Sequence, residues 1–332
     1  MSDTKESTLR TTMAKALTLG MRRAMSEDRS VLLMGEDIGS LGGVYRVTEG
    51  LKADFGAHRV RDTPLGEAGI VGTAIGMAMR GYRPVCEIQF DGFTFPAFNQ
   101  ITTQLAKMHA RTNGDVAVPV TIRIPNGGVI GSVEHHSESP EALFAHTAGL
   151  RIVTPSTPQD AYWMIQQSIA CPDPVIFLEP KRRYWLKGEV NLLQPNTPDP
   201  FSAQVVREGE QLTLVAWGPL VPVAMAAAEA ASQDGRSVEV VDLRSLSPVD
   251  FDTLEASVNH TGRMVIAHEA PVFGGLGGEI ASRITDRCFY SLEAPVQRVG
   301  GYHLPYPPAG VEEEYVPDLD RILDAIDRAF AY

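Results

Sequence analysis

Short apolar runs alternate with amphipathic segments along almost the whole chain. The apolar runs predict buried strands at Val31–Met34, Val85–Ile88, Val118–Ile124, Arg151–Val153, Val175–Leu178, Leu212–Ala216, Val238–Val241 and Met264–Ala267. Segments with helical spacing lie between them, as at Leu9–Ala24 and Val221–Ala231. Strands that alternate with helices predict parallel sheets covered on both faces, which is a doubly wound α/β fold.

One stretch interrupts this alternation. Residues 194–200 (QPNTPDP) are rich in proline and have no periodicity, so they predict an extended linker. A chain of 332 residues is long enough for two domains. We therefore predict two doubly wound α/β domains, at residues 1–195 and 196–332.

The segment from Thr63 to Met79 reads as a helix that is buried nearly all round, with Thr63 and Pro64 at its start. Glu67 falls on its opening turn. A buried carboxyl group stays protonated and can donate a hydrogen bond to a heterocyclic nitrogen. The alternative is an acid favoured only by the helix dipole. A capping box requires glutamate or glutamine at the third helical residue. With Thr63 as the N-cap, that residue is Gly66 and not Glu67, so a capping box is excluded.

Two glycine patterns are ambiguous or negative. Gly69, Gly72 and Gly76 let another backbone approach this helix, either within the chain or across a subunit interface. The segment 274–278 (GGLGG) follows a strand and opens a helix, as a dinucleotide-binding turn does. Ile280 stands where the last glycine of that fingerprint is required, so nucleotide binding is not expected there.

A second segment with chemical potential follows the glycine-rich loop 125–132. Ser139 and Pro140 suit the start of a helix, so His135 and His136 are expected in the loop before it. Adjacent histidines are expected to point in different directions, and no second ligand stands four residues on, so zinc is not expected. The histidines are either incidental surface residues or groups for proton transfer.

Composition excludes several classes of partner. The formal net charge of -12 argues against nucleic acid and anionic membranes. The three cysteines lie far apart, which predicts reduced thiols and neither disulfides nor a cysteine metal site. No apolar run approaches about 20 residues, so we expect a cytoplasmic protein without a membrane span.

Ordered motifs run along the chain from about Leu9 to the C-terminus. They are Gly35–Gly39, Gly42–Leu51, Asp62–Glu67, Glu87–Phe90, Pro96–Gln100, His136–Glu141, Phe177–Lys181, Val241–Arg244, His268–Pro271 and Pro305–Ala309. Together they resemble the beta subunit of the thiamine-diphosphate-dependent decarboxylase component of 2-oxo acid dehydrogenase complexes. The resemblance implies a pyrimidine-binding domain followed by a transketolase C-terminal-like domain. It also implies oxidative decarboxylation with transfer of the acyl group to a lipoyl group.

The resemblance assigns roles to individual residues. Glu67 matches the glutamate that hydrogen-bonds the aminopyrimidine ring of the cofactor and promotes its imino tautomer. Gln89 and Phe93 fall at cofactor-binding positions, and Phe93 can stack on the pyrimidine but lacks a hydroxyl group. His136 matches the histidine associated with reductive acylation of the lipoyl group.

The family also has a monovalent-cation site, which implies potassium. Its positions fall on Val120, Thr121, Ser168, Cys171 and Asp173. Cys171 and Asp173 replace the aspartate and asparagine that are usual in this loop.

The family's diphosphate and magnesium signature, Gly-Asp-Gly followed by an asparagine, is absent from this chain. The resemblance therefore implies an alpha subunit that mainly holds the diphosphate and Mg²⁺, in an α2β2 heterotetramer. It further implies that the C-terminal domain docks onto a dihydrolipoyl acyltransferase core.

The substrate is predicted from local likeness. Glu87–Phe90 and His136–Glu141 resemble the branched-chain subfamily, so we expect a branched-chain 2-oxo acid. The alternatives are a pyruvate dehydrogenase beta subunit and a thiamine-dependent carboligase subunit that forms acyloins. A scaffold subunit with an inert site is a further alternative, against which the presence of Glu67 and His136 argues.

Overall fold

The computed structural model describes residues 8–193 and 198–332. The chain divides into two compact units, Met1–Pro125 with His146–Pro200, and Asn126–Ala145 with Phe201–Tyr332. The predicted boundary between residues 195 and 196 lies outside the described residues. Segment 126–145 leaves the first unit after a strand and belongs to the second, an exchange that the linear sequence pattern did not indicate.

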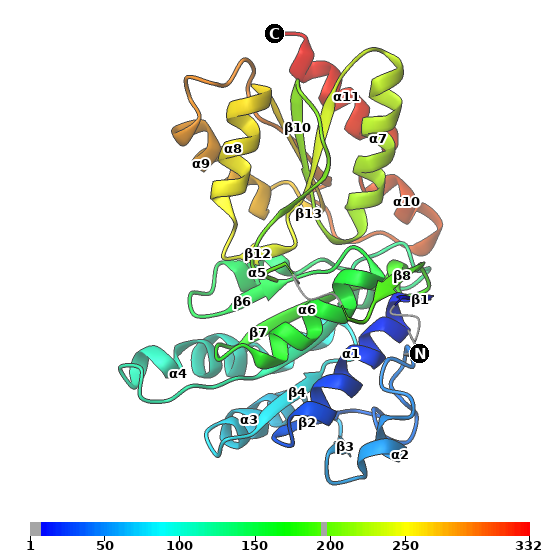
Figure 1. The fold of residues 1–332 in the computed structure, drawn as a ribbon, viewed down its shortest axis with the longest axis vertical. Helices are drawn as coiled ribbons and strands as arrows, with labels where there is room; N and C mark the ends of the chain where they lie inside the picture. Colours follow the sequence, from blue (N-terminus) through cyan, green and yellow to red (C-terminus); the bar gives the residue numbers. More distant parts are fainter. Residues whose placement is uncertain (1–7, 194–197) are drawn as a thin grey trace, which may run out of the picture. The chain divides into compact units, whose positions relative to one another are not determined.

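The first unit is built on a parallel sheet with strand order β6-β7-β5-β4-β2-β3 (Figure 1). A separate antiparallel ribbon pairs β1 with β8. The strands are β1 (Thr8–Thr12), β2 (Val31–Gly35), β3 (Val60–Asp62), β4 (Arg83–Glu87), β5 (Thr121–Asn126), β6 (Arg151–Val153), β7 (Val175–Pro180) and β8 (Lys187–Asn191). The helices are α1 (Met13–Glu27), α2 (Leu51–Phe55), α3 (Glu67–Ala78), η1 (Asp91–Ala97), η2 (Gln100–Leu105), α4 (Ala106–Arg111), α6 (Pro158–Ala170) and η4 (Lys181–Arg183).

Helices α1 and α6 pack closely against each other beside this sheet. A Cβ atom on Gly20 would lie 2.6 Å from the carbonyl oxygen of Tyr162, so glycine allows this approach. Helix α3 packs against β4 and against η1, the short helix that follows β4. The residues after β4 and the start of α3 are thereby held near each other.

A buried ion network joins three neighbouring strands of the first unit. The Arg123 guanidinium on β5 makes two hydrogen bonds to Glu179 on β7, at 2.6 and 2.9 Å, and one to Glu87 on β4, at 2.6 Å. Tyr184 donates to the same Glu179 carboxylate at 2.5 Å. Burial raises the pKa of Glu87, and Arg123 opposes that rise. Buried charges require such pairing, because an unpaired one is costly to desolvate.

The second unit has its own sheet, with strand order β14-β13-β10-β11-β9. Only β9 runs antiparallel to its neighbour. The strands of this sheet are β9 (Gln204–Arg207), β10 (Leu212–Ala216), β11 (Val238–Asp242), β13 (Met264–Pro271) and β14 (Gln297–Gly301). The short strand β12 (Ser245–Ser247) of the same unit is not part of it. The helices are η3 (Glu134–His136), α5 (Glu141–Ala145), η5 (Gly218–Leu220), α7 (Val221–Gln233), α8 (Phe251–Thr261), α9 (Leu276–Arg287), η6 (Ala309–Val311), α10 (Glu312–Tyr315) and α11 (Leu319–Phe330).

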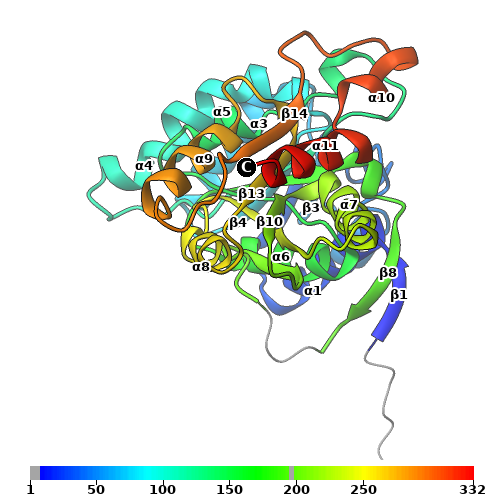
Figure 2. The ribbon, with the colours of Figure 1, turned by 90° about the horizontal axis from the view of Figure 1, so that it is seen from above.

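Helices cover both faces of this second sheet. Helices α7 and α11 lie on one side of β10 and β13, and α8 and α9 lie on the other (Figures 1 and 2). Buried aliphatic residues of the strands, α7 and α11 form one continuous core. Gly275 and Gly277 serve packing, because Cβ atoms on them would lie 2.8 and 2.7 Å from the His268 ring.

Glu141 is a buried acid in the second unit. Its Oε1 atom accepts a hydrogen bond from the Trp217 indole at 3.3 Å, and Oε2 has no partner among the described residues. Burial raises the pKa of Glu141 to about 8, and the negative charge of Glu269 adds to the rise. Glu141 is therefore mostly protonated at neutral pH.

The prediction of two doubly wound α/β domains is confirmed, and every predicted strand is present. The strand predicted at Val118–Ile124 is displaced toward its C-terminal end, to Thr121–Asn126. Leu9 was predicted on a helix but lies on β1, because the polar segment 8–12 pairs with β8. The three cysteines are free and buried.

Two kinds of feature are absent from the described part of the chain. No helix there is long and apolar enough to cross a membrane. Those residues also contain no group of three or more His, Cys, Asp or Glu side chains arranged to hold a metal ion.

We predict that Arg123→Met lowers the free energy of unfolding by about 3–5 kcal/mol, because it leaves Glu179 and Glu87 buried without their cation. Denaturant unfolding measures this change. Arg22→Met is the control, since Arg22 pairs with Asp54 at the surface and such pairs contribute at most about 1 kcal/mol. Equal losses in the two variants would contradict the role given to the network.

We predict that Glu141→Gln stabilises the protein increasingly as pH rises. Between its ordinary pKa of 4.5 and its folded pKa of about 8, the unfolded chain releases the Glu141 proton while the folded chain keeps it. The free energy of unfolding of the wild type therefore falls relative to that of the variant between these two pKa values. Above pH 8 the difference between the two proteins becomes constant. Unfolding free energies at pH 5, 6.5, 8 and 9 test this; parallel curves for the two proteins would rule it out.

Candidate functional site

Glu67 is the first residue of α3, and Gly66 precedes it as the N-cap. The predicted helix start at Thr63 and Pro64 is wrong by three residues. The buried carboxylate of Glu36, which directly follows β2, accepts a hydrogen bond from the Gly66 N–H at 3.1 Å. A side chain distant in sequence thus satisfies a backbone donor at the helix start, a role that local sequence rules assign to a nearby cap.

Glu36 and Glu67 form a pair of carboxyl groups at this helix start. Burial raises the pKa of Glu36, the Gly66 N–H opposes the rise, and the charges of Glu67 and Asp37 add to it. The sequence interpretation did not identify Glu36 as a site residue. The sequence nevertheless contains a sign of it: Glu36 directly follows a buried strand of a parallel sheet, and ligand sites form at the carboxyl ends of such strands.

Gln89 and Phe93 follow β4 and are half-buried in the same unit. The Gln89 side-chain amide donates to the backbone oxygen of Glu36 at 3.5 Å. Phe93 lies edge-on to Phe90, with ring centroids 5.7 Å apart, on the short helix η1 that packs against α3. The structure therefore links Gln89 to the Glu36–Glu67 pair and brings the element carrying Phe93 against α3.

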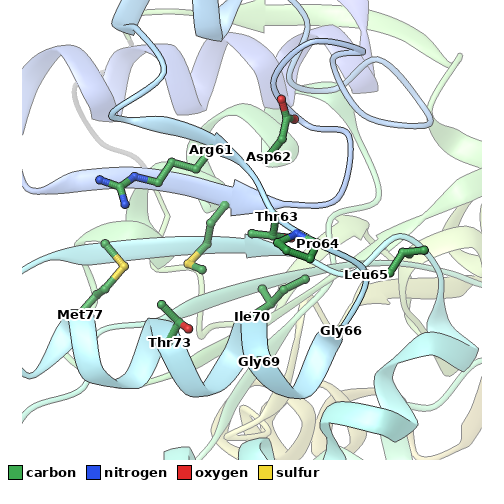
Figure 3. Close-up of a pocket in the computed structure, with 11 residues that line it drawn as sticks. Arg61, Asp62, Thr63, Pro64, Leu65, Gly66, Gly69, Ile70, Thr73 and Met77 are labelled. Carbon is green, nitrogen blue, oxygen red and sulfur yellow. The ribbon is translucent and has the colours of Figure 1, made fainter.

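A pocket of about 500 Å³ opens beside the first turns of α3. Ile70, Thr73 and Met77 project from α3 toward the opposite segment, which contains Arg61 and Pro64 (Figure 3). Its lining residues are Met34, Arg61, Asp62, Thr63, Pro64, Leu65, Gly66, Gly69, Ile70, Thr73 and Met77.

The prediction that this helix is buried nearly all round is wrong for the single chain. Glu67 is half-buried, and Ala68, Gly69, Thr73 and Gly76 are exposed. Nothing lies within 4 Å of a Cβ atom placed on Gly69 or Gly76, so those glycines are not explained by packing within the chain. The face that carries them consists of small residues, and the described chain leaves it uncovered.

His136 lies in the second unit, at the end of the short helix η3, and is half-buried. The rings of His135 and His136 have centroids 4.2 Å apart, so the expectation that they point in different directions is wrong. The tight turn of η3 allows the neighbouring rings to pack. Ser139 does not directly precede a helix, because α5 begins at Glu141. The Ser139 hydroxyl group instead donates a hydrogen bond to Glu269 at 3.2 Å.

The five residues of the predicted cation site lie in the first unit, at the start of β5 and the end of α6. Several of their polar atoms already have partners. Arg83 donates to the carbonyl oxygens of Ile169, Ala170 and Cys171 at 2.9, 3.1 and 3.1 Å, and Asp173 pairs with Arg151 at 2.7 Å. The Val120 carbonyl accepts from the Val175 N–H at 2.9 Å. The Ser168 hydroxyl is buried with no hydrogen-bond partner among the described residues. The potassium site stays a prediction.

Comparison with known proteins identifies both units. Residues 10–185 match the family described as Transketolase, pyrimidine binding domain, and residues 202–322 match Transketolase, C-terminal domain. A solved structure described as a split gene transketolase, inactive beta4 tetramer, has a TM-score of 0.78 at 21% identity, covering 96% of this chain and 98% of that one. At that identity the likeness shows the fold alone.

Curated relatives are similar over nearly their full length. The pyruvate dehydrogenase E1 component subunit beta of Leifsonia xyli subsp. xyli is 62% identical over 321 residues, covering 96% of this chain and 95% of that protein. The 3-methyl-2-oxobutanoate dehydrogenase subunit beta of Mycobacterium tuberculosis is 52% identical, with 96% and 91% covered. The 2-oxoisovalerate dehydrogenase subunit beta of Pseudomonas aeruginosa is 42% identical, with 96% and 94% covered. The chain therefore belongs to the family of E1 beta subunits of 2-oxo acid dehydrogenases, with a transketolase pyrimidine-binding domain followed by a transketolase C-terminal domain.

Proposed function

We propose that this chain supplies the proton-handling half of a thiamine-diphosphate site, in which a branched-chain 2-oxo acid is oxidatively decarboxylated and a lipoyl group is acylated. The observation that carries the proposal is the position of Glu67. This acid begins a helix and interacts electrostatically with the buried acid Glu36, whose backbone oxygen accepts a hydrogen bond from the Gln89 side chain. A nearby negative charge disfavours ionisation, so the charge of Glu67 adds to the rise in the pKa of the buried Glu36.

The residues present fit the pyrimidine half of the cofactor. Nothing lies within 4 Å of a Cβ atom on Gly66, so there is open space beside Glu67, and the half-buried Phe93 offers an aromatic face on an adjoining element. Glu67 would hold a proton at the aminopyrimidine ring nitrogen, and Phe93 would bound the ring. When bound, the cofactor supplies the carbon nucleophile and the electron sink for decarboxylation.

The residues present do not fit the diphosphate half. The described part of the chain holds no acidic or histidine cluster suited to a metal ion, and the sequence lacks the family's diphosphate signature. We therefore propose that an alpha subunit holds the diphosphate and Mg²⁺ in an α2β2 assembly. The uncovered small-residue face of α3 supports a partner chain near Glu67.

His136 would act after decarboxylation, as the acid that protonates a lipoyl sulfur when the acyl group is transferred. The side chain of His136 is only half-buried at the end of η3, which supports this role, because the lipoyl group must reach the site from solvent. The acyltransferase that carries this lipoyl group would dock onto the second unit.

Pyruvate is the second candidate substrate. The Leifsonia xyli relative at 62% identity is named for pyruvate, whereas those at 52% and 42% are named for branched-chain acids. The motifs Glu87–Phe90 and His136–Glu141 favour the branched-chain assignment.

We predict that Glu67→Gln lowers the rate of dye-coupled 2-oxo acid oxidation by about 10²-fold or more, because the amide cannot exchange a proton with the aminopyrimidine. The control is Glu49→Gln, an exposed acid of the same unit, which should leave the rate unchanged. An unchanged rate in Glu67→Gln would exclude the carboxyl group from the chemistry.

We predict that this chain shows activity only when mixed with its alpha subunit, thiamine diphosphate and magnesium. Dye reduction with 2-oxoisovalerate and with pyruvate, with and without the alpha subunit, measures this. A tenfold or greater preference for pyruvate would overturn the branched-chain assignment. Acyloin product without acylation of lipoamide would indicate a carboligase, and activity from this chain alone would refute the two-subunit site.

A further inference from the structure

The loop that leads to His136 has an unusual backbone. Gly127, Val129 and Gly131 have φ angles of 87°, 58° and 74°, in the left-handed region. Glycine adopts this region without strain, but a β-branched residue such as Val129 is a true outlier there. Strained backbone of this kind persists only where surrounding groups determine it, and it is concentrated at functional sites.

One buried carboxylate satisfies the backbone donors of this strained segment. Glu312, at the start of α10, accepts from the Gly131 N–H through Oε1 at 2.7 Å and from the Val129 N–H through Oε2 at 3.1 Å. Tyr306 donates to the same Oε2 at 2.8 Å and accepts from the Val129 N–H at 2.8 Å. Both oxygens of Glu312 are therefore engaged, and the Val129 N–H is held by two acceptors.

Close packing leaves the loop little freedom around this carboxylate. A Cβ atom on Gly128 would lie 2.0 Å from the Tyr306 hydroxyl oxygen, so only glycine fits. Val129 packs against the small cluster of Tyr306, Tyr315 and Val316. A second buried acid, Glu269, accepts from the Gly128 N–H at 2.5 Å.

The held segment is directly connected to His136. The Gly127 N–H donates to the Glu138 carbonyl at 2.9 Å, which closes residues 127–138 into a loop. Within it, the His136 N–H donates to the Val133 carbonyl at 3.0 Å to form the turn of η3. Only four residues separate Gly131, which Glu312 holds, from His136.

We infer that Glu312 is a positioning residue for His136: by fixing the backbone of Val129 and Gly131, it sets where the imidazole is presented to the lipoyl group. The inference rests on the role proposed for His136. Glu312 would therefore affect the transfer of the acyl group to the lipoyl group. It would not affect decarboxylation, for which we propose Glu67 in the other unit.

The test separates the two steps in the assembled enzyme, with this chain and its alpha subunit together. Glu312→Gln keeps the shape of the side chain but presents an amide NH₂ to groups that are themselves donors. We expect acylation of a lipoylated acyltransferase domain to fall about tenfold or more, as small displacements of a catalytic group do, and dye-coupled decarboxylation to stay within about twofold. Glu313→Gln, an exposed neighbour on the same helix, is the matched control and should change neither rate.

His136→Ala provides the reference for complete loss of the transfer step. Tyr306→Phe removes one of the two acceptors of the Val129 N–H, so we expect a smaller loss, in the rate of acyl transfer alone. If Glu312→Gln does not fold, the transfer rate of Tyr306→Phe tests the inference by itself. Equal losses of both rates, or no loss of transfer, would overturn the inference. Failure of the wild-type enzyme to decarboxylate or to acylate would instead refute the proposed function.

Discussion

The first unit depends on the buried ion pairs that the Arg123 guanidinium makes with Glu87 and Glu179. Arg123 lies on β5 and binds carboxylates on both neighbouring strands, Glu87 on β4 and Glu179 on β7. These carboxylates sit near the ends of their strands, where the chain leaves the sheet. Gln89 and Phe93 follow β4, and the loop to His136 follows β5. One cation therefore sets the relative positions of the strand ends from which several candidate site residues extend.

The two candidate residues with acid–base chemistry are supported in the same physical way. In each case a buried acid from a distant part of the chain accepts hydrogen bonds from backbone N–H groups. Glu36 does so at the start of α3, before Glu67, and Glu312 does so in the loop before His136. Backbone donors are available whatever the side chain, so this arrangement fixes the main chain and leaves the reactive side chain free to change.

The sequence was most informative where structure follows from local composition. Buried parallel strands are continuous apolar runs, so β2, β7, β10 and β13 were all predicted close to their observed positions. The start of α3 could not be predicted locally, because its Gly66 N–H is satisfied by Glu36, 30 residues away. The ribbon of β1 and β8 is polar and depends on pairing across the length of the unit. The motifs around Glu67 and His136 identified the family, but no pattern along the chain indicated that Glu312 contacts the loop of His136.

The exchange of segment 126–145 between units has a consequence for the order in which the protein acquires its shape. Val129 and its partner Glu312 are 183 positions apart, and Gly131 and Glu312 are 181 apart. At about 5–20 residues per second, a ribosome needs on the order of ten seconds or more to span that interval. Throughout that time the nascent loop around His136 lacks the acceptor that holds its left-handed backbone, so it can relax to unstrained conformations. The first unit can build most of its sheet during synthesis, whereas this loop takes its final form only when the last stretch of chain has emerged.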